Sequence, residues 1–202
     1  MKAEVRNLSC SRGGIAVLSG VTFALSAGQA LLLRGPNGVG KTTLLRCIAG
    51  LQPVLAGRVM VPEVVYAAHA DGVKGVLSVA ENLGFWAAVQ GASGIGAALA
   101  AMDLAPLADR PAQTLSEGQR RRLGLARLCL GGKGALWLMD EPTVSLDAAS
   151  VGLVTRAVAA HLAQGGMALI ATHLDLDVDA QVLDLSAFRA TAPADAFAGP
   201  IE

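Results

Sequence analysis

The sequence of 202 residues predicts an α/β fold with a mainly parallel core sheet. Short apolar runs that read as buried strands alternate with segments of helical periodicity, which is the pattern of a parallel sheet with helices on both faces. The run at 30–33 leads directly into a glycine-rich loop and then into a helix. An antiparallel opening at 3–25 and a helical insert at 71–113 are expected as additions to this core.

The expected strands follow from alternation, from apolar runs and from flanking turn residues. Val21, Phe23 and Leu25 alternate as a half-buried strand requires, whereas 135–139 is apolar throughout, as a buried parallel strand should be. The expected strands are residues 3–9, 17–25, 30–33, 57–61, 63–68, 135–139, 167–171 and 182–185.

The expected helices carry clear start and stop signals. Ser78 with Glu81, and Ser116 with Gln119, form capping boxes in which each side chain satisfies a free N–H group of the other residue. Asp147 caps a later helix whose apolar side chains recur every three or four positions. Glycine or proline follows each helix. The expected helices, with their N-caps, are residues 43–49, 78–90, 97–102, 116–130 and 147–164.

The loop at 35–43 fits the phosphate-binding pattern G-x-x-x-x-G-K-[ST]. A polyphosphate needs many N–H donors at close range, and glycine lets the backbone approach because it has no Cβ. Lys41 adds a positive charge toward the β- and γ-phosphates, the following helix aims free N–H groups at the same anion, and Thr42 offers a hydroxyl to Mg²⁺. The predicted phosphate-binding residues are Gly35, Pro36, Asn37, Gly38, Val39, Gly40, Lys41, Thr42 and Thr43.

Asp140 and Glu141 follow the apolar run 135–139 directly. Ligands of a parallel sheet gather at the carboxyl ends of its strands, so this pair is expected beside the glycine loop. Asp140 is predicted to hold Mg²⁺, directly or through water, and Glu141 to polarise a water that attacks the γ-phosphate. The alternative is a pair of solvated acids at a strand end, which the buried run before them and Pro142 after them disfavour.

The segment Leu-Ser-Glu-Gly-Gln at 115–119 could be no more than the start of a helix. Arg120, Arg121 and Arg122 follow it, however, and positive charge in the first turns of a helix opposes the helix dipole. Such a helix start is expected to favour an external anion.

Composition limits the function classes. Hydrophobic residues make up 53% of the chain and charged residues 16%, which suggests that a partner covers part of the surface. A net charge of zero argues against nucleic acid as a partner. Charges in the first six residues argue against a signal peptide, and Gly, Ser and Gln interrupt the two long uncharged stretches, so a cytoplasmic chain without membrane spans is expected. The three cysteines match neither a disulfide framework nor a zinc site and are expected to be reduced.

The order and spacing of these motifs resemble those of ABC-transporter nucleotide-binding domains over nearly the whole chain. In that family's terms, 35–43 is similar to the Walker A motif, 115–119 to the signature and 136–141 to the Walker B motif. Residues 145–147 resemble the D-loop, and His173 resembles the switch histidine. The resemblance implies a P-loop NTPase core: a single nucleotide-binding domain that spans the chain, with a helical subdomain at about 71–130.

The resemblance also implies that two chains bind ATP and Mg²⁺ together as a homodimer. Ser116, Gly118 and Gln119 would approach the γ-phosphate that Lys41 of a second copy holds. Asp147 would couple the two sites, and one glycine loop and one signature per chain agree with this arrangement. The catalytic residues that the family implies are Lys41, Glu141 and His173.

Three positions depart from the family pattern. His69 stands where many members have a glutamine that contacts Mg²⁺ and the membrane subunit, and an imidazole can ligate a metal or form hydrogen bonds. The aromatic residue that usually stacks on adenine is absent, and Arg12, whose guanidinium plane can stack on a base, lies nearest its position. Glu117 occupies a signature position that usually holds a small residue, and it is expected to point away from the phosphate.

Within the family, the chain looks most like the ATP-binding subunit of the cytochrome c maturation system, often called the heme exporter ATPase. Segments that carry this narrower resemblance are 34–37, 66–71, 80–85, 119–122, 135–138 and 165–167. It implies a protein on the cytoplasmic face of the bacterial inner membrane, held there by the integral-membrane subunit of that system, whose ATP hydrolysis drives heme delivery.

Two alternatives stay open at this point. One is the ATPase subunit of another exporter, with identical chemistry and a different passenger. The other is a soluble ABC-type switch that acts on ribosomes or DNA, which zero net charge, a single cassette and the lack of a basic tail disfavour. Exposed aromatic side chains at Phe85 and Trp86 would favour docking to a membrane subunit.

Overall fold

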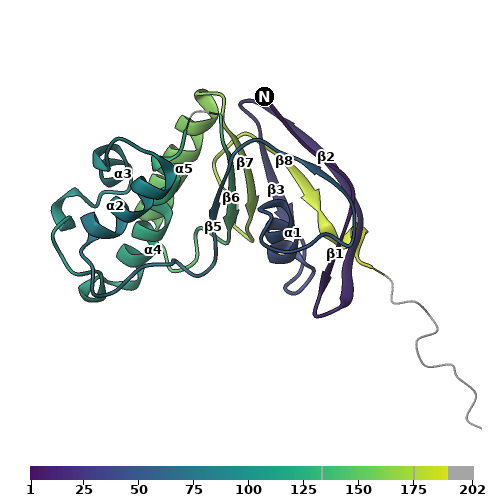
Figure 1. Ribbon diagram of the computed structural model, residues 1–202, viewed down its shortest axis with the longest axis horizontal. Coiled ribbons are helices and arrows are strands. Elements are labelled where there is room, and N and C mark those ends of the chain that lie inside the picture. The colour runs from purple at the N-terminus through teal and green to yellow at the C-terminus, as the bar shows by residue number, and fades with distance from the viewer. Residues whose placement is uncertain (133, 175, 191–202) are drawn as a thin grey trace, which may run out of the picture.

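The computed structural model describes residues 1–132, 134–174 and 176–190 and confirms the predicted α/β fold (Figure 1). A five-stranded parallel sheet has the order β5-β6-β7-β3-β8, and a three-stranded antiparallel sheet has the order β2-β1-β4. The parallel strands are β3 (Ala30–Arg34), β5 (Val64–Ala67), β6 (Leu136–Asp140), β7 (Met167–Ala171) and β8 (Ala180–Asp184). The antiparallel strands are β1 (Lys2–Arg12), β2 (Ile15–Ser26) and β4 (Ala56–Met60).

Helices cover both faces of the parallel sheet. Figure 1 shows α1 between the two sheets, and α5 with the smaller helices on the opposite side. The α-helices are α1 (Lys41–Ile48), α2 (Val79–Gln90), α3 (Gly96–Ala101), α4 (Glu117–Ala126) and α5 (Ala148–Ala163). The 3₁₀ helices are η1 (Ala105–Leu107), η2 (Ala112–Thr114), η3 (Arg127–Leu130) and η4 (Leu185–Phe188). The helix expected at 116–130 therefore ends as α-helix at Ala126 and continues as a 3₁₀ turn.

The hairpin of β1 and β2 is longer than expected because its turn takes only two residues. Gly13 and Gly14 have φ values of 57° and 82°, the left-handed backbone that a two-residue hairpin turn requires. The ladder therefore continues to the pair Arg12 and Ile15. This extra length brings Arg12 to the pocket described below.

The predicted helix caps are confirmed. Ser78 Oγ accepts a hydrogen bond from the Glu81 amide at 3.1 Å, and Glu81 Oε2 accepts one from the Ser78 amide at 2.7 Å. Asp147 Oδ1 accepts a hydrogen bond from the Ser150 amide at 2.8 Å and so begins α5. Each cap satisfies N–H groups that would otherwise lack a partner.

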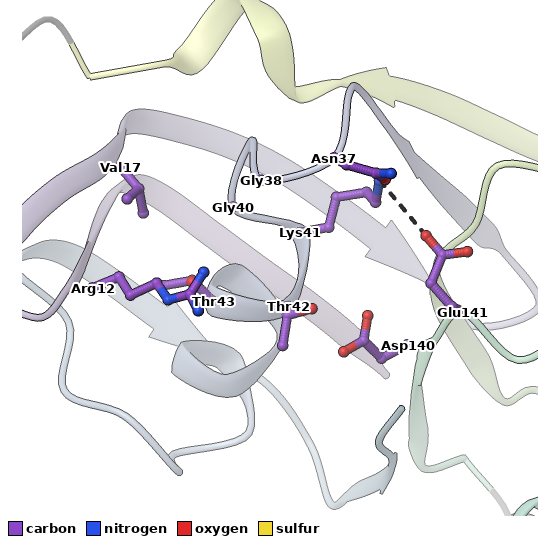
Figure 2. A pocket seen from close by; sticks show the side chains of 10 residues that line it. All are labelled: Arg12, Val17, Asn37, Gly38, Gly40, Lys41, Thr42, Thr43, Asp140 and Glu141. Carbon is purple, nitrogen blue, oxygen red and sulfur yellow. Dashed lines mark ion pairs between the residues drawn. The ribbon is translucent and has the colours of Figure 1, made fainter. Parts of the chain in front are cut away.

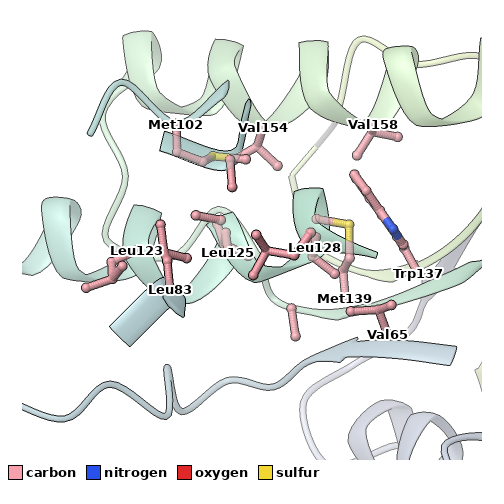
Figure 3. Close-up of a cluster of buried hydrophobic side chains, with 14 of the residues drawn as sticks. Val65, Leu83, Met102, Leu123, Leu125, Leu128, Trp137, Met139, Val154 and Val158 are labelled. Atoms are coloured by element: carbon pink, nitrogen blue, oxygen red, sulfur yellow. The ribbon is translucent and has the colours of Figure 1, made fainter. Parts of the chain in front are cut away.

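Alternate side chains of the parallel strands enter two separate cores. Leu31 and Leu33 of β3 pack with α1 and the antiparallel sheet, whereas Leu32 faces the helices on the other side. Figure 3 shows the second core, where Met139 of β6 lies among side chains from α4, η3 and α5. The helix that follows the 115–119 motif is thus packed onto the strand that ends in Asp140.

The cysteines are free thiols, as expected. Cys10 and Cys47 are buried and Cys129 is partly buried. Burial raises the pKa of Cys10 to about 12 and that of Cys129 to about 11, so both thiols stay protonated and unreactive at neutral pH. Within the described residues, no helix is both long and apolar enough to cross a bilayer.

His161 of α5 is a buried polar residue that sequence analysis did not identify. Its ring stacks on Trp137 of β6 with a centroid distance of 3.9 Å and an interplanar angle of 8°. Its Nε2 lies 3.0 Å from the Ala135 carbonyl oxygen and donates a hydrogen bond to it. Burial lowers the pKa of His161 below its usual value, so the folded protein keeps this ring neutral.

We expect acid to destabilise the fold through His161. Because its pKa is lower in the folded than in the unfolded chain, stability is unaffected above the ordinary histidine pKa. It falls as the pH drops below that value, by at most about 1.4 kcal/mol per pH unit. His161→Gln keeps a donor for the Ala135 carbonyl but does not titrate. Urea unfolding at pH 7.5 and 5.5 should show a smaller pH dependence for this variant, and an equal pH dependence would contradict the assignment.

Candidate nucleotide-binding site

A pocket of about 200 Å³ lies where the carboxyl end of β6 meets the glycine loop and the start of α1 (Figure 2). Residues from four segments line it: Arg12, Val17, Asn37, Gly38, Gly40, Lys41, Thr42, Thr43, Asp140 and Glu141. The structure therefore brings most of the predicted phosphate-binding residues together with the two acids after β6. Gly35, Pro36 and Val39 do not line the pocket.

The glycine loop has a backbone that only glycine adopts easily. Gly38 and Gly40 have φ values of 80° and 119°. A Cβ added at Gly40 would lie 2.9 Å from the side chain of Leu18, so the loop also packs tightly against β2. Gly40 is the N-cap of α1 and offers no side-chain cap, which leaves the first N–H groups of the helix free for an anion.

Lys41 lies at the centre of the site and is 7% exposed. Its Nζ donates hydrogen bonds to the Gly35 carbonyl at 3.0 Å and to His173 Nε2 at 2.8 Å. It also lies 3.6 Å from Glu141 Oε1, the ion pair drawn in Figure 2. The three residues predicted to be catalytic, Lys41, Glu141 and His173, are thus neighbours even though they come from three different segments.

The contact with Lys41 defines the state of His173. A lysine ammonium can only donate, so Nε2 must accept and the ring proton is on Nδ1. In this tautomer the 3.3 Å separation of His173 Nε2 and Glu141 Oε1 is not an ion pair. The imidazole side chain is 48% exposed, so an incoming group can reach it.

Glu141 has an unusual backbone for a residue with a side chain. Its φ is 49°, in the left-handed region, which costs on the order of 1 kcal/mol for a non-glycine residue. The Glu141 N–H donates to the Ala171 carbonyl at 2.8 Å, and its own carbonyl accepts from Arg121 at 2.7 Å. Both ends of the residue are held, which keeps the carboxylate directed toward Lys41.

Thr42 and Asp140 form the part of the pocket that suits a magnesium ion. Asp140 is 1% exposed, and Tyr66 donates a hydrogen bond to its Oδ2 at 3.4 Å. Burial, with the charge of Asp140 as a smaller cause, raises the pKa of Tyr66, so this hydroxyl stays a donor. Among the described residues no cluster of three His, Cys, Asp or Glu could hold a metal unaided. One carboxylate and one hydroxyl instead fit an ion that takes its other oxygen ligands from phosphates and water.

The 115–119 motif lies outside this pocket. Ser116 Oγ accepts from the Gln119 amide at 3.2 Å and Gln119 Oε1 accepts from the Ser116 amide at 3.0 Å, so the predicted capping box is confirmed. Ser116, Gly118 and Gln119 do not line the pocket of their own chain. Glu117 accepts a hydrogen bond from the Ser145 hydroxyl, which directs its carboxylate to the D-loop segment.

The three arginines that follow the motif have partners within this chain, and the binding of an external anion at the helix start stays a prediction. Arg120, Arg121 and Arg122 all donate to backbone carbonyls. Arg121 is 4% exposed, and its charge is paired with Asp71 at 2.7 Å. Carbonyl oxygens of neighbouring loops offset the unfavourable position of these charges near the helix start, which sequence alone could not show.

The structure also separates His69 from the predicted metal ligands. His69 is exposed and lines a different pocket of about 110 Å³, together with Asp71, Glu117 and Ser145. β5 ends at Ala67, and Arg121 holds the carbonyls of Ala68 and His69, so the chain leads toward α4. Arg12, in contrast, does line the pocket, and its stacking on the base stays a prediction. Val17 lines the pocket and was missed by sequence analysis, because no motif marks it. Arg121 was named for its charge alone, and its bonds to the turn after β6 were not predicted.

Known proteins share both the sequence and the fold. Residues 18–144 match the ABC transporter family. The cytochrome c biogenesis ATP-binding export protein CcmA of Cereibacter sphaeroides is 59% identical, over 98% of this chain and 99% of its own length. The protein of the same name from Rhodobacter capsulatus is 61% identical, over 94% of this chain and 89% of its own length.

Solved structures agree with these relatives. An ABC transporter ATP-binding protein from Pyrococcus furiosus superposes with a TM-score of 0.84 at 25% identity, over 94% of this chain and 100% of that one. The family match covers more than half of the chain, and full-length relatives are about 60% identical to it. This chain therefore belongs to the ABC transporter family of ATP-binding proteins.

Proposed function

We propose that this chain is the ATP-hydrolysing subunit of a membrane complex that drives heme export or delivery for c-type cytochrome biogenesis. The observation that carries the proposal is full-length similarity near 60% to proteins named as cytochrome c biogenesis ATP-binding export proteins. In this proposal the chain forms one nucleotide-binding domain, and residues 71–130 form its helical subdomain.

The chemistry follows from the pocket. The loop N–H groups and Lys41 bind the phosphates of ATP, and Arg12 with Val17 receives the base side of the nucleotide. Thr42 and Asp140 would hold Mg²⁺, which would supply positive charge against the phosphates. Glu141 orients the attacking water and takes up its proton.

Lys41 couples nucleotide binding to the positions of the other catalytic groups. Its present partners are the Glu141 carboxylate at 3.6 Å and His173 Nε2 at 2.8 Å. A γ-phosphate is a stronger anionic partner for this ammonium than a single carboxylate. Binding of ATP therefore frees Glu141 for the water and lets His173 contact the γ-phosphate.

A second copy of the chain completes the site in this proposal. Ser116, Gly118 and Gln119 begin a helix that lies outside their own chain's nucleotide pocket, since none of them lines it. In a homodimer they close over the ATP that the second copy holds. Two ATP molecules then lie between the chains, each bound by a glycine loop from one and a signature from the other.

An apolar groove suits the integral-membrane partner. Phe85 and Trp86 of α2 line a hollow of about 430 Å³ together with Gly72, Lys74, Val76, Leu77 and Asn82. Phe85 is 58% exposed and Val76 81% exposed, which is unusual for such large apolar side chains unless a partner covers them. We propose that the membrane subunit docks here, which holds the chain on the cytoplasmic face of the bacterial inner membrane. Zero net charge gives no support for nucleic acid as a partner.

Lys41→Ala tests the function in cells. Loss of a charged partner should weaken ATP binding about 10- to 100-fold, and cells that carry only this variant should lack covalently bound heme in their c-type cytochromes. Heme staining of membrane proteins after electrophoresis reads the result. Arg156→Ala, on the exposed side of α5, is the matched control and should leave cytochromes normal. Normal cytochromes with Lys41→Ala would instead assign the chain to another exporter.

A further inference from the structure

Arg121 connects three segments that surround the catalytic end of β6. It lies on α4, two residues after the 115–119 motif, and its guanidinium lies within hydrogen-bond distance of five acceptors. The two N–H groups of Nη1 are shared among Ala68 O at 3.1 Å, His69 O at 3.0 Å and Asp71 Oδ1 at 2.7 Å. Nη2 donates to Asp140 O at 3.1 Å and Glu141 O at 2.7 Å.

Only an arginine can make this set of contacts. Its planar fork presents two nitrogens in a fixed geometry, so one can hold the 68–71 segment while the other holds the turn after β6. A lysine ammonium is a single point with three donors and cannot span both groups of acceptors. At 4% exposure, the side chain also has little water to replace a lost partner.

The absence of a side chain at Gly124 of α4 leaves room for Asp71 beside Arg121. Gly124 lies three residues after Arg121, and therefore on the same face of the helix. A Cβ added at Gly124 would lie 2.8 Å from the Cβ of Asp71, a distance at which one of the two must move. A glycine at this position lets Asp71 approach closely enough to pair with the guanidinium.

Arg121 also holds one end of the strained residue Glu141. The left-handed backbone of Glu141, with φ of 49°, is fixed by its N–H bond to Ala171 and by its carbonyl bond to Arg121. Loss of the second bond would let this turn relax toward a more ordinary backbone. The carboxylate would then leave its position 3.6 Å from Lys41 Nζ.

We propose that Arg121 is a positioning residue for ATP hydrolysis. It links α4, the helix that begins after Ser116, to the turn in which Glu141 lies. When α4 closes on the nucleotide of a second copy, this link also sets the position of the Glu141 carboxylate. The inference depends on the proposed ATPase function. It predicts an effect on turnover and not on the binding of ATP, because Arg121 does not line the nucleotide pocket.

Arg121→Lys is the main test, with Arg122→Lys as its matched control. Arg122 is on the same helix and donates to Met102 O at 2.7 Å and Asp103 O at 3.0 Å. Neither acceptor belongs to the turn in which Glu141 lies. Steady-state ATP hydrolysis should show kcat reduced roughly 10- to 100-fold in Arg121→Lys, with KM for ATP within about twofold of wild type. Gly124→Ala should reduce kcat in the same direction by displacing Asp71. Arg122→Lys should keep kcat.

Hydrogen–deuterium exchange supplies a readout that needs no turnover. Amides in residues 139–146 should exchange faster in Arg121→Lys than in wild type and be unchanged in Arg122→Lys. A folded Arg121→Lys with unchanged kcat and unchanged exchange would overturn the inference, as would a change in KM alone. If Arg121→Lys does not fold, Gly124→Ala is judged by the same two criteria. A wild-type chain without ATPase activity would contradict the proposed function, while the exchange data would still decide the role of Arg121.

Discussion

Glu141→Gln should bind ATP like the wild-type chain and lose hydrolysis by about 100-fold or more. A general base contributes roughly 10²- to 10⁴-fold to a rate, and glutamine has nearly the same shape as glutamate but cannot take up a proton. The Glu141 side chain lines the pocket 3.6 Å from Lys41, and in the proposed mechanism it orients and activates the water. Phosphate binding depends on the loop and on Lys41, which the substitution leaves intact.

Phosphate release under single-turnover conditions measures the chemical step, and titration with a fluorescent ATP analogue measures binding. Glu63→Gln is the control, because this acid is exposed and does not line the nucleotide pocket. It should hydrolyse ATP at the wild-type rate. Wild-type turnover by Glu141→Gln would remove Glu141 from the role of base.

Gly118→Asp should reduce hydrolysis about 100-fold while each chain still binds ATP. Gly118 lies at the start of α4 and outside the pocket of its own chain, so the aspartate cannot disturb the Lys41 site directly. In the proposed dimer its carboxylate would face the γ-phosphate bound by the second copy, and two anions in close contact repel strongly.

Gly118→Ala separates this charge effect from a steric one. A Cβ at position 118 would lie 3.2 Å from the Ser145 carbonyl, which is tight for either substitution. Alanine adds this Cβ without a charge and should therefore retain much more activity than aspartate. Steady-state rates of the two variants, measured at the same chain concentration, give the comparison. Equal losses would show that crowding against Ser145, and not the phosphate, explains the effect.

Local signals in the sequence predicted most of the elements and the phosphate pocket. The capping residues Ser78, Ser116 and Asp147 begin helices as expected, because a cap depends only on residues three positions away. The glycine loop could also be predicted from neighbouring residues, because it lies directly between a buried strand and a helix. The hairpin was predicted too short because its two-residue glycine turn was read as a longer loop.

Contacts between segments that are far apart in the chain could not be predicted from the sequence. Arg121 was named only as one of three charges that oppose the helix dipole, because its partners lie 19 to 53 residues away and are mostly carbonyl oxygens, which every residue has. The stacking of His161 on Trp137 was missed for the same reason. His69 was assigned to the metal because it stands where many family members have a glutamine. In the structure it lines another pocket, and its role as a metal ligand stays a prediction.

In the proposed mechanism, ATP holds two copies of this chain together, and each copy completes the other's site. Light scattering on Glu141→Gln measures this most directly, since slow hydrolysis keeps the ATP in place. With ATP and Mg²⁺ the mass should rise to twice the 20.4 kDa of one chain, and Gly118→Asp added to the same chain should abolish the rise. A mass that stays at 20.4 kDa with ATP bound, together with undiminished hydrolysis by Gly118→Asp alone, would contradict the account.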